Sequence, residues 1–434
     1  MNTLIFNFNN TLIDSGALAS LNKKLKAMIG KLALVRNATD YCTPEALINL
    51  PFDGDMHKEV KALVSLKKKL NPVCIIVIGI GGSNLGTQAI YNALFTKRPD
   101  CPLYFADTLD SEYIATLLEL VEEILSSHNQ VLMCVISKSG TTTETIANFE
   151  CFLAVLLQYR PNNYSEYIIA ITDQDSRLWQ LATRQRFACL AIPAAIGGRY
   201  SVLSAVGLFP LACAGIDIDA LVQGAQAVVA DCIREDNKNY AAQSAAISAY
   251  HYDNGKTIHD FFTFNIWLEG IGKWYRQLVA ESLAKEHTLD GKQAYRGITP
   301  TVSVATTDLH SVGQLYLGGP FDKLTTFVWV ENTFKDVYIP SFAQYENLVG
   351  NIQGKSLNHL MRAIFYGVQK AYSDNNRPFI TITFPEKTPY YLGQFLQYKM
   401  IEVIYLGALL EVNPFDQPHV ELYKTQTKKI LAYE

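Results

Sequence analysis

The stretch VCIIVIGIGGSNLG, residues 73–86, decides the fold of this chain. It begins with a continuous apolar, largely β-branched run, which is typical of a strand buried on both faces of a parallel sheet. A glycine-rich turn follows, and residues 85–95 then predict a helix. Apolar strands joined by helices build α/β domains in which helices cover both faces of the sheet.

The same alternation continues along the chain. It predicts further strands at 131–137, 167–173, the end of 255–264, 299–305, 324–330 and 378–384, and further helices at 143–158, 266–284, 390–411 and from 420 onward. We therefore expect an α/β fold with two doubly wound, three-layer domains and a helical C-terminal segment. The expected boundaries are an N-terminal helical segment at 1–50, a first domain at 51–195, a second domain at 196–390, C-terminal helices completing the site at 391–434, and a connection near 192–217.

Composition narrows the class of protein. The 434 residues are 49% apolar and 18% charged, with a net charge of −4, which argues against a nucleic-acid-binding surface over the whole molecule. The start of the chain has no basic region followed by a cleavage site, and no apolar stretch is long enough to span a bilayer. The eight scattered cysteines include Cys74 and Cys134, expected as small buried hydrophobes, so we expect a cytoplasmic protein without membrane partners.

Two loops suit an anion. In the first, Gly79–Gly86, glycines let the backbone approach a ligand closely at the start of a helix; the alternative is a plain tight turn. Asn84 breaks the GxGxxG dinucleotide pattern, and no GK[ST] follows. The second loop, SKSGTTTET at 137–145, offers a cluster of hydroxyl groups at a helix start, which favours a phosphate monoester. Glu144 could also form a capping box with Thr141.

Four further segments carry ionisable side chains. Arg199 follows a glycine pair in IGGRYSVLSAVG (196–207), where a guanidinium can stabilise an oxyanion. Gln277 and Glu281 share one helix face, and a carboxylate there can accept a proton. His310 lies in a strand-to-helix link and can transfer protons near neutral pH. For each of these side chains, and for Lys424, the alternative interpretation is an ordinary solvated or structural residue.

Together and in this order, these segments resemble the glucose-6-phosphate isomerase family, from about residue 73 to residue 424. The stretches IGGRYSVLSAVG and GALLEVNPFDQPHVELYK (407–424) match its signature patterns closely. The resemblance implies two sugar-isomerase (SIS) domains of the shorter bacterial form. It further implies an aldose–ketose isomerase of glycolysis and gluconeogenesis that interconverts glucose 6-phosphate and fructose 6-phosphate through a cis-enediolate, without metal or cofactor.

The resemblance also implies roles for particular residues. Glu281 matches the base that moves the proton between C1 and C2, and Arg199 matches the arginine that stabilises the enediolate. His310 and Lys424 match the groups that assist ring opening. The substrate-binding positions that it implies are Gly82, Ser83, Ser137, Lys138, Ser139, Thr141, Thr142, Thr145, Gln277 and Gln417.

Two expectations concern assembly and a local departure. Family members are usually homodimers whose histidine enters the partner's site, so His310 is expected to act across the interface. Relatives often have ESNGK where this chain has Glu281-Ser282-Leu283-Ala284-Lys285. Leucine and alanine favour helix more than asparagine and glycine do, so the shape of this loop is open.

Three other functions compete with this interpretation. A related SIS isomerase, such as a bifunctional phosphoglucose/phosphomannose isomerase, remains open because stereochemistry at C2 depends on pocket contacts. The isomerase half of glucosamine-6-phosphate synthase would need a glutaminase domain with an N-terminal cysteine, which this chain lacks. A non-catalytic sugar-phosphate-binding module typically lacks the acid–base set, and an NAD-dependent dehydrogenase would need the fingerprint that Asn84 breaks.

Overall fold

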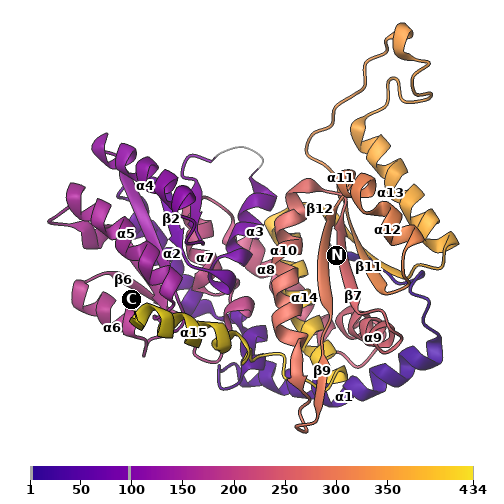
Figure 1. Ribbon diagram of the computed structural model, residues 1–434, viewed down its shortest axis with the longest axis horizontal. Coiled ribbons are helices and arrows are strands. Elements are labelled where there is room, and N and C mark those ends of the chain that lie inside the picture. Colours follow the sequence, from indigo (N-terminus) through magenta and orange to yellow (C-terminus); the bar gives the residue numbers. More distant parts are fainter. Residues whose placement is uncertain (1–2, 96–98, 434) are drawn as a thin grey trace.

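The computed structural model describes residues 3–95 and 99–433, and it has two α/β lobes side by side (Figure 1). Ahead of the first lobe lie β1 (Ile5–Asn7) and the long helix α1 (Ser15–Ala38). The first lobe contains η1 (Pro44–Phe52), α2 (Gly54–Lys68), β2 (Pro72–Ile78), η2 (Gly81–Ser83), α3 (Leu85–Leu94), β3 (Leu103–Ala106), α4 (Ser111–Ser126), β4 (Gln130–Ile136), α5 (Thr143–Tyr159), η3 (Tyr164–Tyr167), β5 (Ile168–Thr172), α6 (Arg177–Gln185) and β6 (Ala188–Ala191).

The first sheet places both predicted anion loops together. Its order is β3-β2-β4-β5-β6, with every pair of neighbours parallel. The chain passes from β2 outward to β3 and then returns to the other side of β2, so the strand order reverses between β2 and β4. In open α/β sheets, ligands bind outside the carboxyl ends of the strands at such a point. The loops after β2 and β4 are the two glycine- and hydroxyl-rich loops of the sequence.

The second lobe follows a connection formed by η4 (Gly198–Tyr200) and α7 (Ala205–Cys213). Its elements are α8 (Ile218–Cys232), α9 (Tyr240–Asp253), β7 (Ile258–Thr263), η5 (Ile266–Leu268), α10 (Glu269–Leu283), β8 (Lys285–His287), β9 (Gln293–Arg296), β10 (Thr299–Val304), α11 (Thr307–Ser311), α12 (Gly313–Gly318), β11 (Lys323–Asn332), η6 (Ala343–Tyr345), α13 (Leu357–Asp374), β12 (Phe379–Glu386), α14 (Pro389–Leu409) and α15 (Val420–Tyr433).

The second sheet has the order β1-β12-β11-β7-β10. All neighbours are parallel except β1, which pairs antiparallel with β12 through Ile5 opposite Thr383. The predicted doubly wound α/β architecture is therefore present in both lobes, with one added antiparallel edge strand. We predicted only helix for the N-terminal segment, and the pairing of β1 with a strand far along the chain gives no local signal.

The predicted strands at 73–79, 131–137, 167–173, 299–305, 324–330 and 378–384 correspond to β2, β4, β5, β10, β11 and β12, and the strand expected at the end of 255–264 is β7. No strand was predicted at β1, β3, β6, β8 or β9, each of which is four residues or shorter. Cys74 and Cys134 are fully buried, as predicted, and all eight cysteines are free thiols.

Helices join the two lobes. Helix α10 packs against α3 of the first lobe, where Gly270 comes so close that an added Cβ would lie 3.1 Å from the Cα of Ala89. Helix α14 is buried over most of its circumference between α8, α9 and α10, which explains why its sequence is mostly apolar and why its charged residues Lys399 and Glu402 are buried as an ion pair. The carboxylate-bearing end of α10 thereby lies close to η2 and η4.

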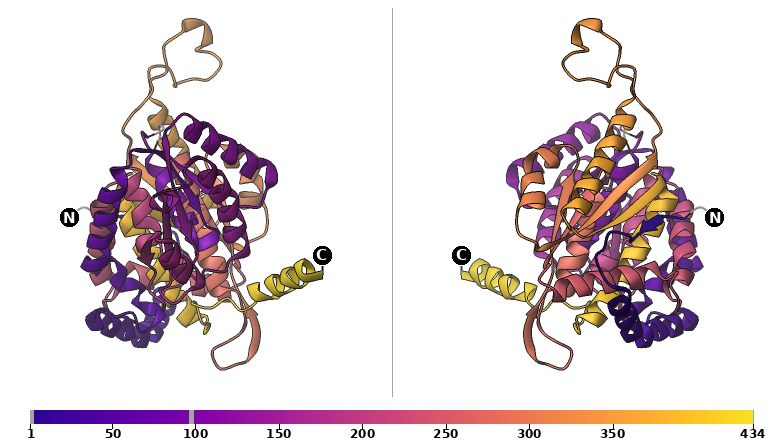
Figure 2. Two further views of the ribbon diagram at one scale, coloured as in Figure 1. Left: turned by 90° about the vertical axis from the view of Figure 1, so that its left-hand side faces the viewer. Right: turned by 90° about the vertical axis from the view of Figure 1, so that its right-hand side faces the viewer.

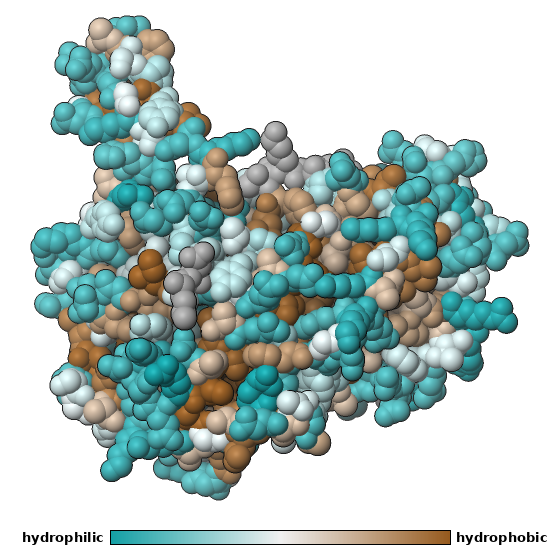
Figure 3. All heavy atoms as spheres, turned by 180° about the vertical axis from the view of Figure 1, so that it is seen from behind, coloured by the Kyte–Doolittle hydropathy of each residue, from teal (hydrophilic) through white to brown (hydrophobic). Residues whose placement is uncertain are grey.

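Besides the hairpin of β8 and β9, two segments project from the body (Figure 2). One is an arm of residues 333–356 between β11 and α13, which stands free in the space-filling view (Figure 3). The other is the terminal helix α15. Both expose large apolar side chains, including Tyr338, Leu348 and Leu422, which are 71%, 77% and 65% exposed. Among the helices in the described ranges, none is both long enough and apolar enough to cross a bilayer.

Candidate active site

Arg199 lies at the centre of a cluster between the lobes. It is buried, and its Nε donates a hydrogen bond to Ser282 Oγ at 2.8 Å. One terminal nitrogen donates to Gln417 Oε1 at 2.6 Å and to Glu281 Oε2 at 3.3 Å. The structure thus brings together three predicted site residues, Arg199, Glu281 and Gln417, that lie more than two hundred residues apart at the extremes.

The other terminal nitrogen of Arg199 fixes the C-terminal segment. It donates to the carbonyl of Pro414 at 2.7 Å and to that of Asp416 at 3.2 Å. Tyr200 adds a hydrogen bond from its hydroxyl to the Pro414 carbonyl at 3.0 Å, and burial raises the pKa of that hydroxyl. All five N–H donors of the guanidinium are thereby occupied, so its position is set by the end of α10 and by the C-terminal loop.

Glu281 lies at the C-terminal end of α10 with its side chain 34% exposed. Its Oε1 accepts a hydrogen bond from Gln277 Nε2 at 3.0 Å, and its Oε2 faces Arg199. The predicted (i, i+4) pairing on one helix face is confirmed by this bond. The carboxylate is therefore held by two donors while part of it stays open to a ligand.

The glycine-rich loop after β2 lies against the loop that carries Arg199. A Cβ added at Gly82 would lie 2.3 Å from the carbonyl carbon of Gly198 and 2.5 Å from the nitrogen of Arg199, so only glycine fits. Gly81 has a positive φ of 59°, and a Cβ there would lie 3.1 Å from Gln277 Nε2. Gly82 and Ser83, predicted to contact the sugar, thus border the Arg199 cluster within η2.

The loop after β4 is organised around Ser137. Its buried hydroxyl hydrogen-bonds with Thr142 Oγ1 at 2.9 Å and accepts from the backbone N–H of Gly140 at 3.1 Å. Gly140 has a positive φ of 67°, which turns the chain back toward α5. The hydroxyl of Thr145 is buried without a partner in the described structure. A buried hydroxyl without a partner is costly unless a ligand or water satisfies it, which suits a binding loop.

The remaining predicted loop residues lie around this turn. Ser139 and Thr141 are exposed and hydrogen-bond to each other at 3.3 Å. Lys138 is half-buried, and desolvation lowers the pKa of its ammonium group, although Asp173 opposes that shift. Thr142 precedes α5 as its N-cap residue but its side chain caps no backbone N–H, because it is hydrogen-bonded to Ser137 instead. The hydroxyl groups are thus available at the start of a helix.

The structure does not bring His310 and Lys424 into the cluster. His310 is exposed on α11, beyond the carboxyl end of the edge strand β10, and within the described chain no hydrogen bond or ion pair connects it to Arg199 or Glu281. Lys424 lies on the projecting helix α15, where its Nζ pairs with Glu421 Oε1 at 2.7 Å. The side chain of His310 is exposed, and that of Lys424 is 41% exposed on a projecting helix.

Sequence reasoning assigned no role to several residues of the cluster. Ser282 and Tyr200 lie next to Glu281 and Arg199 in the sequence, and their hydroxyls hydrogen-bond with each other at 2.8 Å. Lys285 follows two residues after the end of α10, and Asp416 precedes Gln417. Only their position next to predicted residues could have identified them from the sequence, because nothing in composition or spacing distinguishes them.

The residues Leu283 and Ala284, whose loop shape the sequence left open, end the helix. Leu283 is fully buried and is the last residue of α10, and Ala284 is extended, with φ −78° and ψ 103°. The helix therefore does not continue beyond Leu283, although both residues favour helix.

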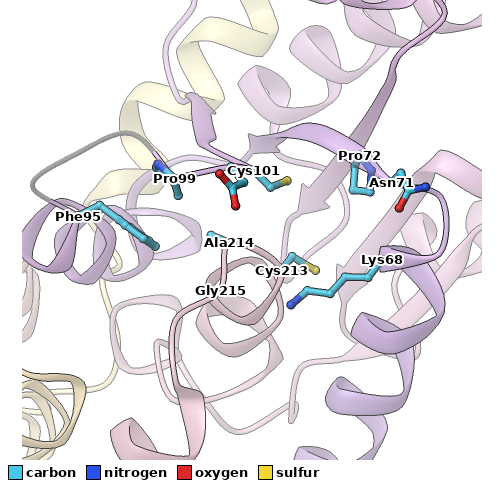
Figure 4. Close-up of a pocket in the computed structure, with 10 residues that line it drawn as sticks. Lys68, Asn71, Pro72, Phe95, Pro99, Cys101, Cys213, Ala214 and Gly215 are labelled. Carbon is cyan, nitrogen blue, oxygen red and sulfur yellow. The ribbon is translucent and has the colours of Figure 1, made fainter.

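A cavity of about 570 Å³ lies elsewhere in the first lobe (Figure 4). It opens beside Pro72, at the amino end of β2, and is lined by Lys68, Cys101 and Cys213 among others. Burial raises the pKa of the Cys101 thiol to about 11. The two anion loops follow the carboxyl ends of the strands, at the opposite edge of the sheet, and no predicted site residue lines this cavity. Its chemistry does not compete with that of the Arg199 cluster.

Two α/β lobes with parallel sheets, and a partly exposed carboxylate held by arginine and glutamine at their junction, define the class as a two-domain α/β protein with a candidate acid–base site. A sequence model described as phosphoglucose isomerase matches residues 66–433. The chain belongs to the phosphoglucose isomerase family, as the sequence resemblance predicted.

Named relatives agree with this assignment. The chain is 38% identical over 371 residues to a glucose-6-phosphate isomerase of Symbiobacterium thermophilum, an overlap that covers 82% of this chain and 80% of the relative. It is 36% identical over 402 residues to a glucose-6-phosphate isomerase of Clostridium novyi, covering 89% and 86% of the two chains.

Solved structures share the fold. A hypothetical protein of Thermus thermophilus superposes with a TM-score of 0.89 at 29% identity, covering 99% of this chain and 100% of that one. A glucose-6-phosphate isomerase of Chlamydia trachomatis superposes with a TM-score of 0.85 at 21% identity, covering 100% and 89%. The predicted two-domain α/β architecture is confirmed by these superpositions.

Proposed function

We propose that this chain is a glucose-6-phosphate isomerase that interconverts glucose 6-phosphate and fructose 6-phosphate. The relatives from Symbiobacterium thermophilum and Clostridium novyi, at 38% and 36% identity, are both named glucose-6-phosphate isomerase. The observation that carries the proposal is the partly open carboxylate of Glu281, held between Arg199 and Gln277 at the junction of the two lobes. A partly exposed carboxylate fixed by donors is arranged to move a proton within a bound substrate.

The phosphate is expected to bind in the loop at 137–145. Ser137, Thr142 and the partnerless hydroxyl of Thr145 supply donors there, at the start of α5. Binding energy from this non-reacting group then positions the sugar carbons toward the second lobe. We expect Ser83 and Gln417 to contact the sugar hydroxyls; this is supported by the hydrogen bond of Gln417 to Arg199 and by the packing of η2 against η4.

Glu281 would remove the proton from C2 of the open-chain aldose and return it to C1, while the hydroxyl proton on O2 passes to O1, which together yield the ketose. Negative charge develops on the enediolate oxygens, and Arg199 stabilises it. The bond between Arg199 and Glu281, at 3.3 Å, is the longest of the five that the guanidinium makes. It is therefore the bond that a substrate oxygen can most easily replace.

His310 and Lys424 would assist ring opening. Both are exposed, so another surface would have to pack over them to complete the site. We propose that a second copy of the chain supplies it in a homodimer with shared sites. The arm at 333–356 exposes Phe334, Tyr338 and Leu348, and α15 exposes Leu422 and Ile430. Apolar groups gathered on projecting segments are typical of protein–protein interfaces. Free thiols throughout the chain favour a reducing, cytoplasmic location.

The test is a coupled assay in which fructose 6-phosphate is supplied and glucose 6-phosphate is detected, with and without a chelator. Turnover that the chelator leaves unchanged is the expected result. No turnover, together with measurable binding of 6-phosphogluconate, would contradict the catalytic proposal and leave a sugar-phosphate-binding module. Mannose 6-phosphate tested under the same conditions would show how strictly the site selects configuration at C2.

A further inference from the structure

Lys285 is a buried lysine beside the proposed base. It is the first residue of β8, two residues after the helix end, and is 7% exposed. Its Nζ donates to the backbone carbonyl of Glu281 at 2.6 Å and lies 3.7 Å from Asp416 Oδ1. One ammonium group therefore touches both the residue that carries the base and the loop that carries Gln417.

The contact with Glu281 caps the end of α10. The helix ends at Leu283, so the carbonyl of Glu281 is among the last four, which have no partner within the helix. A cation near a helix C-terminus also interacts favourably with the helix dipole. Lys285 thus fixes the backbone of the turn from which the Glu281 carboxylate projects.

The contact with Asp416 is one of several between the hairpin of β8 and β9 and the C-terminal segment, which together are called the clasp. The hairpin of β8 and β9 meets the C-terminal segment again where Glu286 Oε2 lies 2.8 Å from His419 Nε2, and where the N–H of Leu289 donates to the Glu411 carbonyl at 2.7 Å. Those contacts lie nearer the surface, whereas Lys285 lies inside, next to Arg199. Lys285 is therefore the part of the clasp closest to the chemistry.

We propose that Lys285 is a positioning residue for isomerisation: its ammonium group locks the backbone of Glu281 to the Asp416–Gln417 loop. This inference rests on the proposed function. The lock holds the carboxylate and the Gln417 amide in one arrangement about Arg199, and misplacement by about 1 Å can cost a factor of about 100 in rate.

The charge of Lys285 depends on its surroundings. Burial, and after it the charge of nearby Arg199, lowers the pKa of its ammonium group to about 8, while Asp416 and Glu281 oppose the shift. Across the hairpin it faces Arg296, whose own charge is paired with Glu411 at 3.5 Å. As the pH rises through about 8, Lys285 loses its proton and its attraction for Asp416, so the rate is expected to fall.

The experiment compares Lys285→Met, Lys285→Arg and the control Lys273→Met, which removes a half-exposed lysine from α10. kcat and KM for fructose 6-phosphate are measured from about pH 6 to about pH 10 with excess coupling enzyme, a range that brackets the lysine titration. Lys285→Met is expected to lower kcat at neutral pH by about 10- to 100-fold with little change in KM. Lys285→Arg is expected to retain most of kcat and to move the alkaline decline upward, because arginine stays charged.

The inference is overturned if Lys285→Met keeps wild-type kcat, or if Lys285→Arg declines at the same pH as the wild type. If Lys285→Met does not fold, the arginine variant still decides between the two outcomes. A wild-type chain without isomerase activity would instead refute the proposed function. Activity in the wild type that Lys285→Met leaves unchanged refutes this inference alone.

Discussion

The Arg199 cluster and the pair His310 and Lys424 are held in opposite ways. Arg199 is buried, uses all of its donors and binds two distant parts of the chain at once, the end of α10 and the C-terminal loop. His310 is exposed on the short helix α11, and Lys424 pairs only with Glu421 on its own projecting helix in the described structure. One region is complete within a single chain, whereas the other faces outward.

This difference implies that the two steps of the proposed reaction depend on different levels of structure, the fold of one chain and the assembly of two chains. In the proposed mechanism, proton transfer between C1 and C2 uses the Glu281 carboxylate and Arg199, and the fold of one chain brings these two groups together. The proposed ring opening uses His310 and Lys424, which the proposed dimer would have to place. Variants within the cluster should therefore fail in every context, and variants outside it should be rescued by a partner.

Removing the base should have the largest effect. Glu281→Gln keeps the shape of the side chain but cannot accept the proton, so kcat is expected to fall by about 10³- to 10⁴-fold with a modest change in KM. Steady-state kinetics measure this loss. Glu269→Gln, at the exposed start of the same helix, is the matched control and should retain wild-type kcat. Near-normal turnover by Glu281→Gln would remove Glu281 from the mechanism.

Shortening the arginine should come second. Arg199→Lys keeps the charge but loses the five-donor fork, so we expect kcat to fall by about 10²- to 10³-fold. The melting temperature should fall too, because each buried carbonyl left without a donor costs about 1–3 kcal/mol. Thermal melts and kinetics are compared with Arg184→Lys, on the surface of α6. A variant with full activity would mean that the guanidinium is structural only.

Replacing His310 should lower kcat least of the three changes, and a partner chain should restore the lost activity. His310→Ala is expected to lower kcat by about 10- to 100-fold. Mixing it with Glu281→Gln under subunit exchange should restore about a quarter of the wild-type activity, since half of the dimers are mixed and each has one intact site. Mixing Glu281→Gln with Arg199→Lys is the control and should restore nothing, because both changes lie in one chain's cluster. Absence of recovery despite proven exchange would contradict a shared site.

The sequence predicted the parts of the fold whose signal is local. The apolar runs of β2, β4 and β5 are buried on both faces, so their composition alone identifies them. Strand β1 is three residues at a sheet edge, and β6 is four residues, too short to show a pattern. Helices α8 and α9 were not assigned either, since nothing in the motif pattern required them.

The sequence placed Arg199, Gln277, Glu281 and Gln417 among the candidate residues that the fold brings together, but it did not predict most of the hydrogen bonds between them. The spacing of Gln277 and Glu281 predicted that both lie on one helix face, and the structure adds the hydrogen bond between them. The bonds from Arg199 to the Pro414 and Asp416 carbonyls involve backbone groups, which have no sequence signature. The exposure of His310 depends on which surfaces remain uncovered after folding, and that is a property of the whole tertiary structure.

Strand β1 also constrains the order in which the two lobes can fold during synthesis. Its partner residues in β12 reach as far as Thr383, so the second sheet lacks its edge until that part of the chain has left the ribosome. At about 5–20 residues per second, the first residues wait roughly 20 to 80 seconds for their partner. During that interval the first lobe can fold while the N-terminal segment stays unpaired. A chaperone or a fusion tag acting on these residues would therefore delay the second lobe and leave the first one intact.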